Sequence, residues 1–289
     1  MKLIYITLLT ILISINSYSQ SSEFELGIYN VGLGGIGSRI GAMINKKPNE
    51  KLITVFCKGF LKGALGGTFV YGSKKLVQNI YKENKIEYNW PAKILNSLGT
   101  SMIENASSNR TLLEQIHFNL GFNRFEFYTK DKFKVKYKIM PGALALTVFC
   151  AINNKPEWGL MLRSGEVIFS TNDDMNLNKN SNGRALVTSV IIRESKINDL
   201  SVIAHEFIHI YQYHDYNFVN PYFNNLVNKY DTNEGILKPR SSILYWDFNL
   251  IVLAGLYQIE NINQLNYYDN FFEYEAEFYS ADDVLFKSN

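Results

Sequence analysis

The sequence predicts an α+β protein in which a small, mostly antiparallel sheet lies beside one amphipathic helix and the C-terminal part is helical. Three observations support this class. Apolar residues recur at helical spacing in residues 195–213, they alternate with polar residues in residues 125–139, and helical patterns return after residue 243. A chain of 289 residues that is 46% hydrophobic and 19% charged has the composition of a globular protein with a sizeable core.

The charge and cysteine content exclude some classes and leave others open. A formal net charge of +2 argues against a strongly basic nucleic-acid binder, so no nucleic-acid partner is expected. The two cysteines, Cys57 and Cys150, both lie in apolar stretches. They can pair in an oxidising compartment or remain as buried thiols, and the sequence does not choose between these states.

The N-terminus has the pattern of a secretory signal peptide. Met1 and Lys2 give a short basic start, residues 3–15 are almost wholly apolar, and Ser17 and Ser19 supply small residues before a cleavage point. We therefore expect residues 1–20 to be a leader. The mature chain is expected in the periplasm, outside the cell or on an outer surface.

Residues 21–110 form a glycine-rich region that we expect to be mainly helical. Within its apolar stretch, residues 52–72, glycines recur every four residues at Gly59, Gly63 and Gly67. On a helix they form one smooth stripe that lets another backbone approach closely. The favoured interpretation is a packed core helix, because Lys58 and Lys62 interrupt the run. Apposition of this region to a membrane is the second interpretation.

The middle of the chain is expected to contain one further helix and then the sheet. Pro91 suits the first turn of a helix that continues to Glu104. Period-two alternation then predicts a hairpin with one apolar face and one lysine-rich face. A second hairpin is expected around Ser164 and Gly165, and a buried strand follows it. The predicted strands are residues 125–129, 133–139, 161–163, 166–170 and 185–194.

The next helix, residues 195–213, carries the candidate catalytic and metal-binding residues. Ser195 or Asn198 is expected to cap its start. His205 and His209 are four residues apart, so both imidazoles point to one side, as two ligands of a single Zn²⁺ must. Glu206 projects beside such a metal and can take a proton from an activated water. Gln212 lies on the same side.

A metal ion needs a third protein ligand, and the sequence offers two candidates. His214 follows His209 by five residues. The better candidate is Glu273, which shares one face of a predicted helix over residues 270–282 with Glu277, whereas Glu275 points elsewhere. The pair of Asn270 and Glu273 also fits a helix-capping box, in which Glu273 would bind no metal.

Together the two motifs resemble a known family. The run His205-Glu206-Phe207-Ile208-His209, with Glu273-Tyr274-Glu275-Ala276-Glu277 downstream, resembles the gluzincin class of zinc metallopeptidases, and most closely the CaaX-prenyl-protease-like peptidases. The resemblance covers two short helices. It implies a zincin-like unit over residues 111–289, Glu273 as third zinc ligand and Glu277 as the acid that supports a ligating histidine. Glu277 stands where the family has Asp, and the family's flanking transmembrane helices are lacking, so its substrate does not transfer.

These observations predict a secreted, zinc-dependent metallopeptidase. It would hydrolyse a peptide or protein substrate with a metal-activated water, and Glu206 would be the general base. A buried helix is expected under the site at residues 243–259. One side chain near the two motifs is expected to stabilise the oxyanion that forms when the peptide carbonyl is attacked. The candidates are Tyr211, Tyr213, His214, Tyr216, Tyr267 and Tyr268.

Two alternatives stay open. One is a non-enzymatic envelope or membrane-associated protein with a structural or vestigial metal site, in which the glycine-rich region is the working surface. The other is a zinc hydrolase that cleaves an amide in the cell wall.

Overall fold

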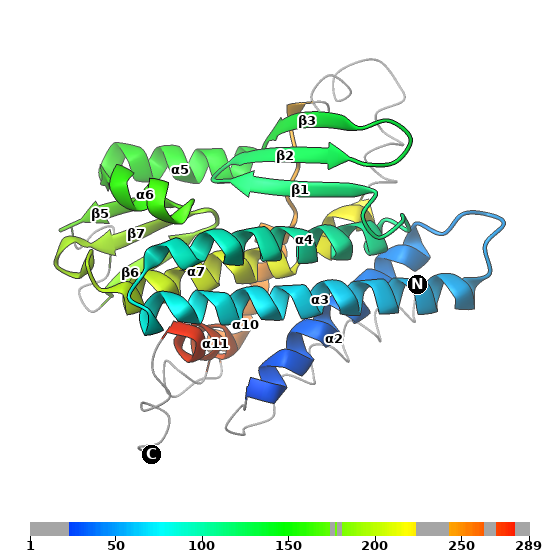
Figure 1. Ribbon diagram of the computed structural model, residues 1–289, viewed down its shortest axis with the longest axis horizontal. Helices are drawn as coiled ribbons and strands as arrows, with labels where there is room; N and C mark the ends of the chain where they lie inside the picture. The colour runs from blue at the N-terminus through cyan, green and yellow to red at the C-terminus, as the bar shows by residue number, and fades with distance from the viewer. Residues whose placement is uncertain (1–22, 174–176, 178–180, 224–242, 263–269, 281–289) are drawn as a thin grey trace.

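The computed structural model describes residues 23–173, 177, 181–223, 243–262 and 270–280, and the expected leader lies outside them. The predicted α+β class is confirmed (Figure 1). The long helices α2, α3, α4 and α7 pack side by side, and α4 covers one face of the first sheet. The shorter helices α10 and α11 pack against α7.

The helices are α2 (Glu23–Ile44), α3 (Leu52–Lys82), α4 (Asn89–Ser107), α5 (Pro141–Asn153), α6 (Trp158–Ser164), α7 (Leu200–Asp215), α10 (Asn249–Ile262) and α11 (Phe271–Ser280). The strands are β1 (Gln115–Leu120), β2 (Asn123–Tyr128), β3 (Lys134–Ile139), β4 (Lys155–Pro156), β5 (Val167–Thr171), β6 (Gly183–Leu186) and β7 (Ser189–Arg193). Short 3-10 segments include η3 (Asn217–Phe223), which follows α7.

The strands form two separate sheets. In the first, β1, β2 and β3 are antiparallel neighbours, and Phe125 of β2 lies opposite Tyr137 of β3, so the predicted first hairpin is confirmed. The second sheet has the order β4-β5-β7-β6 and is mixed, because β5 and β7 are parallel while the outer pairs are antiparallel. Strand β6 is an edge of this sheet and lies against α7.

Two sequence predictions for the region that forms the second sheet are wrong. The first arm of the second hairpin is part of helix α6, which ends at Gly165 in the left-handed conformation (φ +76°). The single strand expected at residues 185–194 is a tight hairpin of β6 and β7, which turns at Val187 with a φ of +62°. Helix α5, which begins at Pro141, was not predicted, since its sequence is apolar throughout and has no clear period.

The glycine stripe of α3 is the contact surface for α2, as predicted. A Cβ at Gly63 would lie 2.2 Å from the backbone oxygen of Gly34, and one at Gly67 would lie 2.3 Å from that of Asn30. Among the described helices, α3 alone is long and apolar enough to cross a membrane, and 33% of its most apolar window is buried. It packs against α2, α4 and α7.

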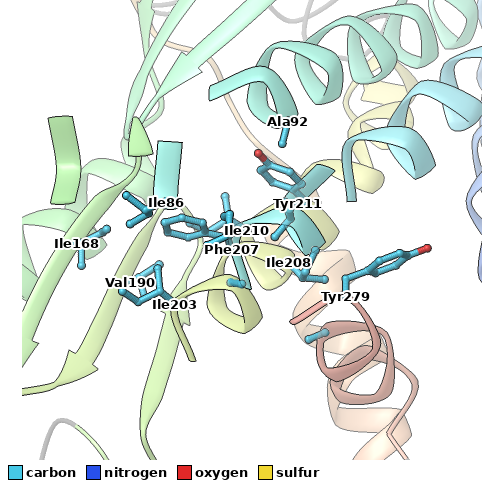
Figure 2. Packing of buried hydrophobic residues seen from close by; sticks show 14 of the residues in the cluster. Ile86, Ala92, Ile168, Val190, Ile203, Phe207, Ile208, Ile210, Tyr211 and Tyr279 are labelled. Atoms are coloured by element: carbon cyan, nitrogen blue, oxygen red, sulfur yellow. The ribbon is translucent and has the colours of Figure 1, made fainter. Parts of the chain in front are cut away.

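The main hydrophobic core surrounds α7 (Figure 2). Strands β5 and β7 contribute one side of it, with Ile168 and Val190 fully buried. Helix α7 contributes Phe207 and Ile208, and Tyr279 of α11 closes the cluster. Because this packing fixes α7 on several sides, its remaining face has a defined position.

Three smaller expectations are corrected. The residue at the N-cap of α7 is Asp199, not Ser195 or Asn198, and its side chain makes no capping hydrogen bond. The helix expected at residues 243–259 begins later, and its residues are half-buried or exposed except for Asn249, which is buried. Cys57 is exposed and Cys150 is buried, and both thiols are free.

Candidate metal centre

The two histidines of α7 point to one side of the helix, away from the core. The two Nε2 atoms of His205 and His209 lie 3.2 Å apart, and the rings meet edge to face. Both side chains are only partly buried, at 14% and 16% exposed. The four-residue spacing thus produces the convergence that the sequence predicts.

Helix α11 brings Glu273 to the same point. Its Oε2 atom lies 3.2 Å from Nε2 of His205 and 3.3 Å from Nε2 of His209. Asn270 caps α11, because its Oδ1 accepts a hydrogen bond from the N–H of Phe272. The Glu273 carboxylate is therefore directed at the histidines while Asn270 caps the helix.

The three atoms form a nearly equilateral triangle that fits a metal ion. A tetrahedral zinc with ligands at about 2.0–2.1 Å separates those ligands by about 3.3–3.4 Å. The measured separations of 3.2, 3.2 and 3.3 Å match this spacing. Among the described residues, this is the one cluster of histidine, cysteine and acidic side chains with such geometry. Two imidazoles and one carboxylate suit Zn²⁺ and also other first-row transition metals.

The second polar atom of each of these three side chains has its own partner. Nδ1 of His205 lies 3.4 Å from Oε2 of Glu277, in the supporting position that the resemblance implies. Nδ1 of His209 is 2.8 Å from Oε1 of Gln212. Tyr257 of α10 donates a hydrogen bond of 2.6 Å to Oε1 of Glu273, while Oε2 faces the two histidines. Such partners hold ligands in orientation.

The carboxylates alter the protonation of His205 in the metal-free protein. Burial alone would lower its pKa, but hydrogen bonds to Glu273 and Glu277 raise the pKa to about 10. A metal ion bound by Nε2 of His205 would displace a proton, so metal binding at neutral pH would release it.

Glu206 lies beside the triangle with one oxygen unused. Its side chain is 5% exposed, and Oε2 has no hydrogen-bond partner among the described residues. Burial raises the pKa of Glu206, His209 and His205 lower it, and Glu273 raises it again. Strand β6 passes very close, because a Cβ at Gly183 would lie 2.6 Å from Oε1 of Glu206. A buried carboxylate with a free oxygen is suited to accept a proton.

A cavity of about 1470 Å³ opens in front of these residues. Its walls come from β6, from α5 and from a stripe of α10 that has helical spacing. The lining includes Leu146, Ser181, Asn182, Arg184, Leu186, Leu250, Leu253, Ala254 and Tyr257. The residues expected as a buried helix under the site thus form a side wall of the cavity instead.

The other candidates from the sequence lie apart from the triangle or outside the described residues. His214 is buried in another environment, where burial first and then Lys93 and Arg124 lower its pKa to about 3. Among the tyrosines considered, Tyr213 lines the cavity, whereas the hydroxyl of Tyr211 binds Asn89. Tyr216 pairs with Tyr29. Tyr267 and Tyr268 lie outside the described residues.

Neither Tyr257 nor the role of Gln212 is predicted from the sequence. Helical spacing already placed Gln212 on the histidine side of α7, so that part of the signal was present. Nothing in the sequence links Tyr257 to Glu273, which is 16 residues away on another helix.

Comparisons of the chain with models of known protein families, with curated proteins and with solved structures found no match.

Proposed function

We propose that this chain is a secreted zinc-dependent metallopeptidase of the gluzincin type. The observation that carries the proposal is the convergence of Nε2 of His205, Nε2 of His209 and Oε2 of Glu273 at mutual distances of 3.2–3.3 Å, beside the free carboxylate oxygen of Glu206. The adjoining cavity exceeds the roughly 300–1,000 Å³ of a small-molecule pocket. This size favours a peptide or protein substrate.

The roles of the side chains follow from their positions. When bound, Zn²⁺ would polarise the scissile carbonyl and make the attacking water more acidic. His205, His209 and Glu273 would hold the ion, and Glu277 would orient His205. Glu206 would accept the proton of the attacking water and then deliver it to the leaving amine.

The test compares metal content with peptide hydrolysis. The purified protein should contain about one zinc per chain by elemental analysis and should cleave a library of unstructured peptides. Glu206→Gln should keep the zinc and lose activity by about 10²–10⁴-fold, because the base is removed while the ligands remain. Glu87→Gln, in an exposed ion pair with Arg163, is the matched control. Unchanged peptidase activity in Glu206→Gln would refute the mechanism, and cleavage of cell-wall fragments but not of peptides would indicate an amide hydrolase.

The alternative is a non-enzymatic, membrane-associated envelope protein with a structural or vestigial metal site. One observation favours it: large apolar side chains are exposed on α2 and α3, namely Phe24, Ile28, Ile53 and Leu61. It predicts that zinc raises the melting temperature, that no peptide is cleaved, and that the protein floats with lipid vesicles in a density gradient.

A further inference from the structure

A group of buried charges lies where α3, α7 and α11 meet, next to the metal centre. Lys74 of α3 is fully buried and contacts the carboxylates of Asp215 at 2.6 Å and Glu275 at 2.9 Å. Its third acceptor is Oδ1 of Asn30, on α2, at 2.9 Å. The three N–H bonds of the ammonium group thus have three acceptor residues. Burial alone would lower the pKa of Lys74, but Asp215 and Glu275 raise it, so Lys74 remains a cation.

Gln212 connects this charged group to the metal centre. Its side-chain nitrogen donates to Oε2 of Glu275 at 3.0 Å and to the backbone oxygen of Phe272 at 2.8 Å. Its side-chain oxygen lies 2.8 Å from Nδ1 of His209. One amide therefore contacts a carboxylate, a carbonyl and a candidate ligand.

The partners of Gln212 determine which way its amide points. A carboxylate and a carbonyl accept hydrogen bonds and cannot donate them. If the amide of Gln212 were reversed, its oxygen would face Glu275 and Phe272 without a hydrogen between them. The observed orientation places the oxygen on His209, so Nδ1 of His209 must carry the proton. In a neutral His209 the lone pair is then on Nε2, the atom that faces His205 and Glu273.

We propose that Lys74 is a positioning residue for the metal centre: it holds Glu275 in place, Glu275 orients the amide of Gln212, and Gln212 selects the His209 tautomer that binds metal through Nε2. This inference rests on the proposed metal function for its significance. It gives the glycine-rich N-terminal region a role at the site, because Lys74 and Asn30 belong to that region.

The tautomer can be measured without any metal. Two-bond ¹H–¹⁵N correlation spectra of the metal-free, ¹⁵N-histidine-labelled protein distinguish an Nδ1 proton from an Nε2 proton once His209 is neutral. Free histidine in water favours the Nε2–H form. We expect His209 to be in the Nδ1–H form in the wild type and to shift towards the Nε2–H form in Lys74→Met.

Zinc affinity provides the second readout. Lys74→Met should weaken zinc binding by about 10–100-fold, as typical for a residue that supports a ligand. Gln212→Leu should cause a similar loss, and adding Lys74→Met to it should cause little more, because both act through one chain of contacts. The matched control is Lys93→Met, which breaks another buried pair, with Glu166 at 2.6 Å, and should leave tautomer and affinity unchanged.

The outcomes separate this proposal from the proposed function. A wild-type His209 in the Nε2–H form, or an unchanged tautomer in Lys74→Met, would overturn the positioning role even if the protein is a peptidase. A wild type that binds no zinc but shows the predicted tautomer shift would overturn the metallopeptidase and leave the positioning intact. If Lys74→Met does not fold, Lys74→Met combined with Glu275→Gln removes Lys74 together with one of its two carboxylate partners, and the same two readouts apply.

Discussion

At the scale of single residues, the candidate centre is held by contacts on the outer side of every ligand. His205 is backed by Glu277, His209 by Gln212 and Glu273 by Tyr257. A ligand that is already oriented loses less conformational freedom when the metal binds. The centre is therefore preorganised, and the strength of metal binding should depend on residues that never touch the ion.

Tyr257 gives a direct test of this dependence. Tyr257→Phe removes the 2.6 Å hydrogen bond to Oε1 of Glu273 and leaves the ring in place. We expect about 10-fold weaker zinc binding with an unchanged melting temperature of the metal-free protein, measured by competition with a chromogenic chelator. Tyr137→Phe, which removes a hydrogen bond to Asn123 on the first sheet, is the control. Equal zinc affinities for the two variants would contradict the role of Tyr257.

The sequence predicts the candidate metal ligands and the candidate base better than it predicts the residues that hold them in place. His205, Glu206 and His209 follow from helical spacing alone, and Glu273 follows from the resemblance of its motif. Lys74 is different, because its partners lie on helices that come together only in the folded chain. No local pattern distinguishes it from a solvent-exposed lysine of the same helix.

At the scale of elements, α2 and α3 can pack closely only because glycines, which have no side chain, lie at their contact. Gly34 and Gly63 face each other, and each would place a Cβ 2.2–2.5 Å from the backbone oxygen of the other. Backbone atoms in two packed helices cannot move aside as a side chain can. This contact positions α3, and with it Lys74, relative to α2, which carries Asn30, another partner of Lys74.

A pair of glycine substitutions tests this contact. Gly63→Ala should lower the free energy of unfolding by about 1–3 kcal/mol, because the added methyl group overpacks the helix contact. Gly32→Ala, on the same hairpin but with no atom within 4 Å of the new Cβ, should raise it by roughly 0.5–1 kcal/mol through better helix propensity. Urea unfolding measures both. Similar effects at the two positions would contradict the close approach.

Elements with a clear period are predictable from the sequence, and those without one are not. The alternation of residues 125–139 gives β2 and β3, and helix α4 follows its Pro91 signal. Helix α5 was not predicted, and residues 161–163 of the short helix α6 were expected to be a strand, because a short apolar run fits either structure until its packing is known. The mixed second sheet depends on a parallel pairing of β5 with β7 that no local pattern encodes.

At the scale of the whole molecule, many ionisable groups are buried in networks. His117 and His214 lie near Arg124, and Lys93 also faces His214. Burial, then Arg124 and His214, lower the pKa of His117 well below its usual value. Both histidines are therefore neutral in the folded protein at moderately acidic pH, whereas the unfolded chain protonates them below about 6.5.

This difference predicts how acid affects stability. A depressed histidine pKa contributes stability that is present above pH 6.5 and is lost as the pH falls below it, because the unfolded state then binds more protons. For His214, with a pKa of about 3 in the folded protein, the loss between pH 6.5 and 5 is about 2 kcal/mol. Burial raises the pKa of Asp215 to about 6 and that of Asp247 to about 7. These two carboxyl groups therefore add stability as the pH falls, which opposes the effect of the histidines.

The comparison of wild type with His214→Gln isolates this effect. Because the variant has no group to protonate there, its stability relative to the wild type should improve by about 2 kcal/mol as the pH falls from 6.5 to 5. Chemical unfolding in the presence of a chelator measures it without interference from metal release. A constant difference across this range would show that folding does not lower the pKa of His214, which would contradict the prediction.

The contacts of Lys74 also bear on the order in which parts of the molecule fold. They join residues 141 and 201 positions apart in the chain, and Glu273 lies 68 positions beyond His205. Bringing such distant segments together costs more chain entropy than forming local contacts, so we expect these contacts to form late in folding. A partly folded chain would therefore lack a finished metal centre. If the proposed peptidase function holds, a chain that completes its metal centre last would be unable to cut itself or its neighbours while it is still folding.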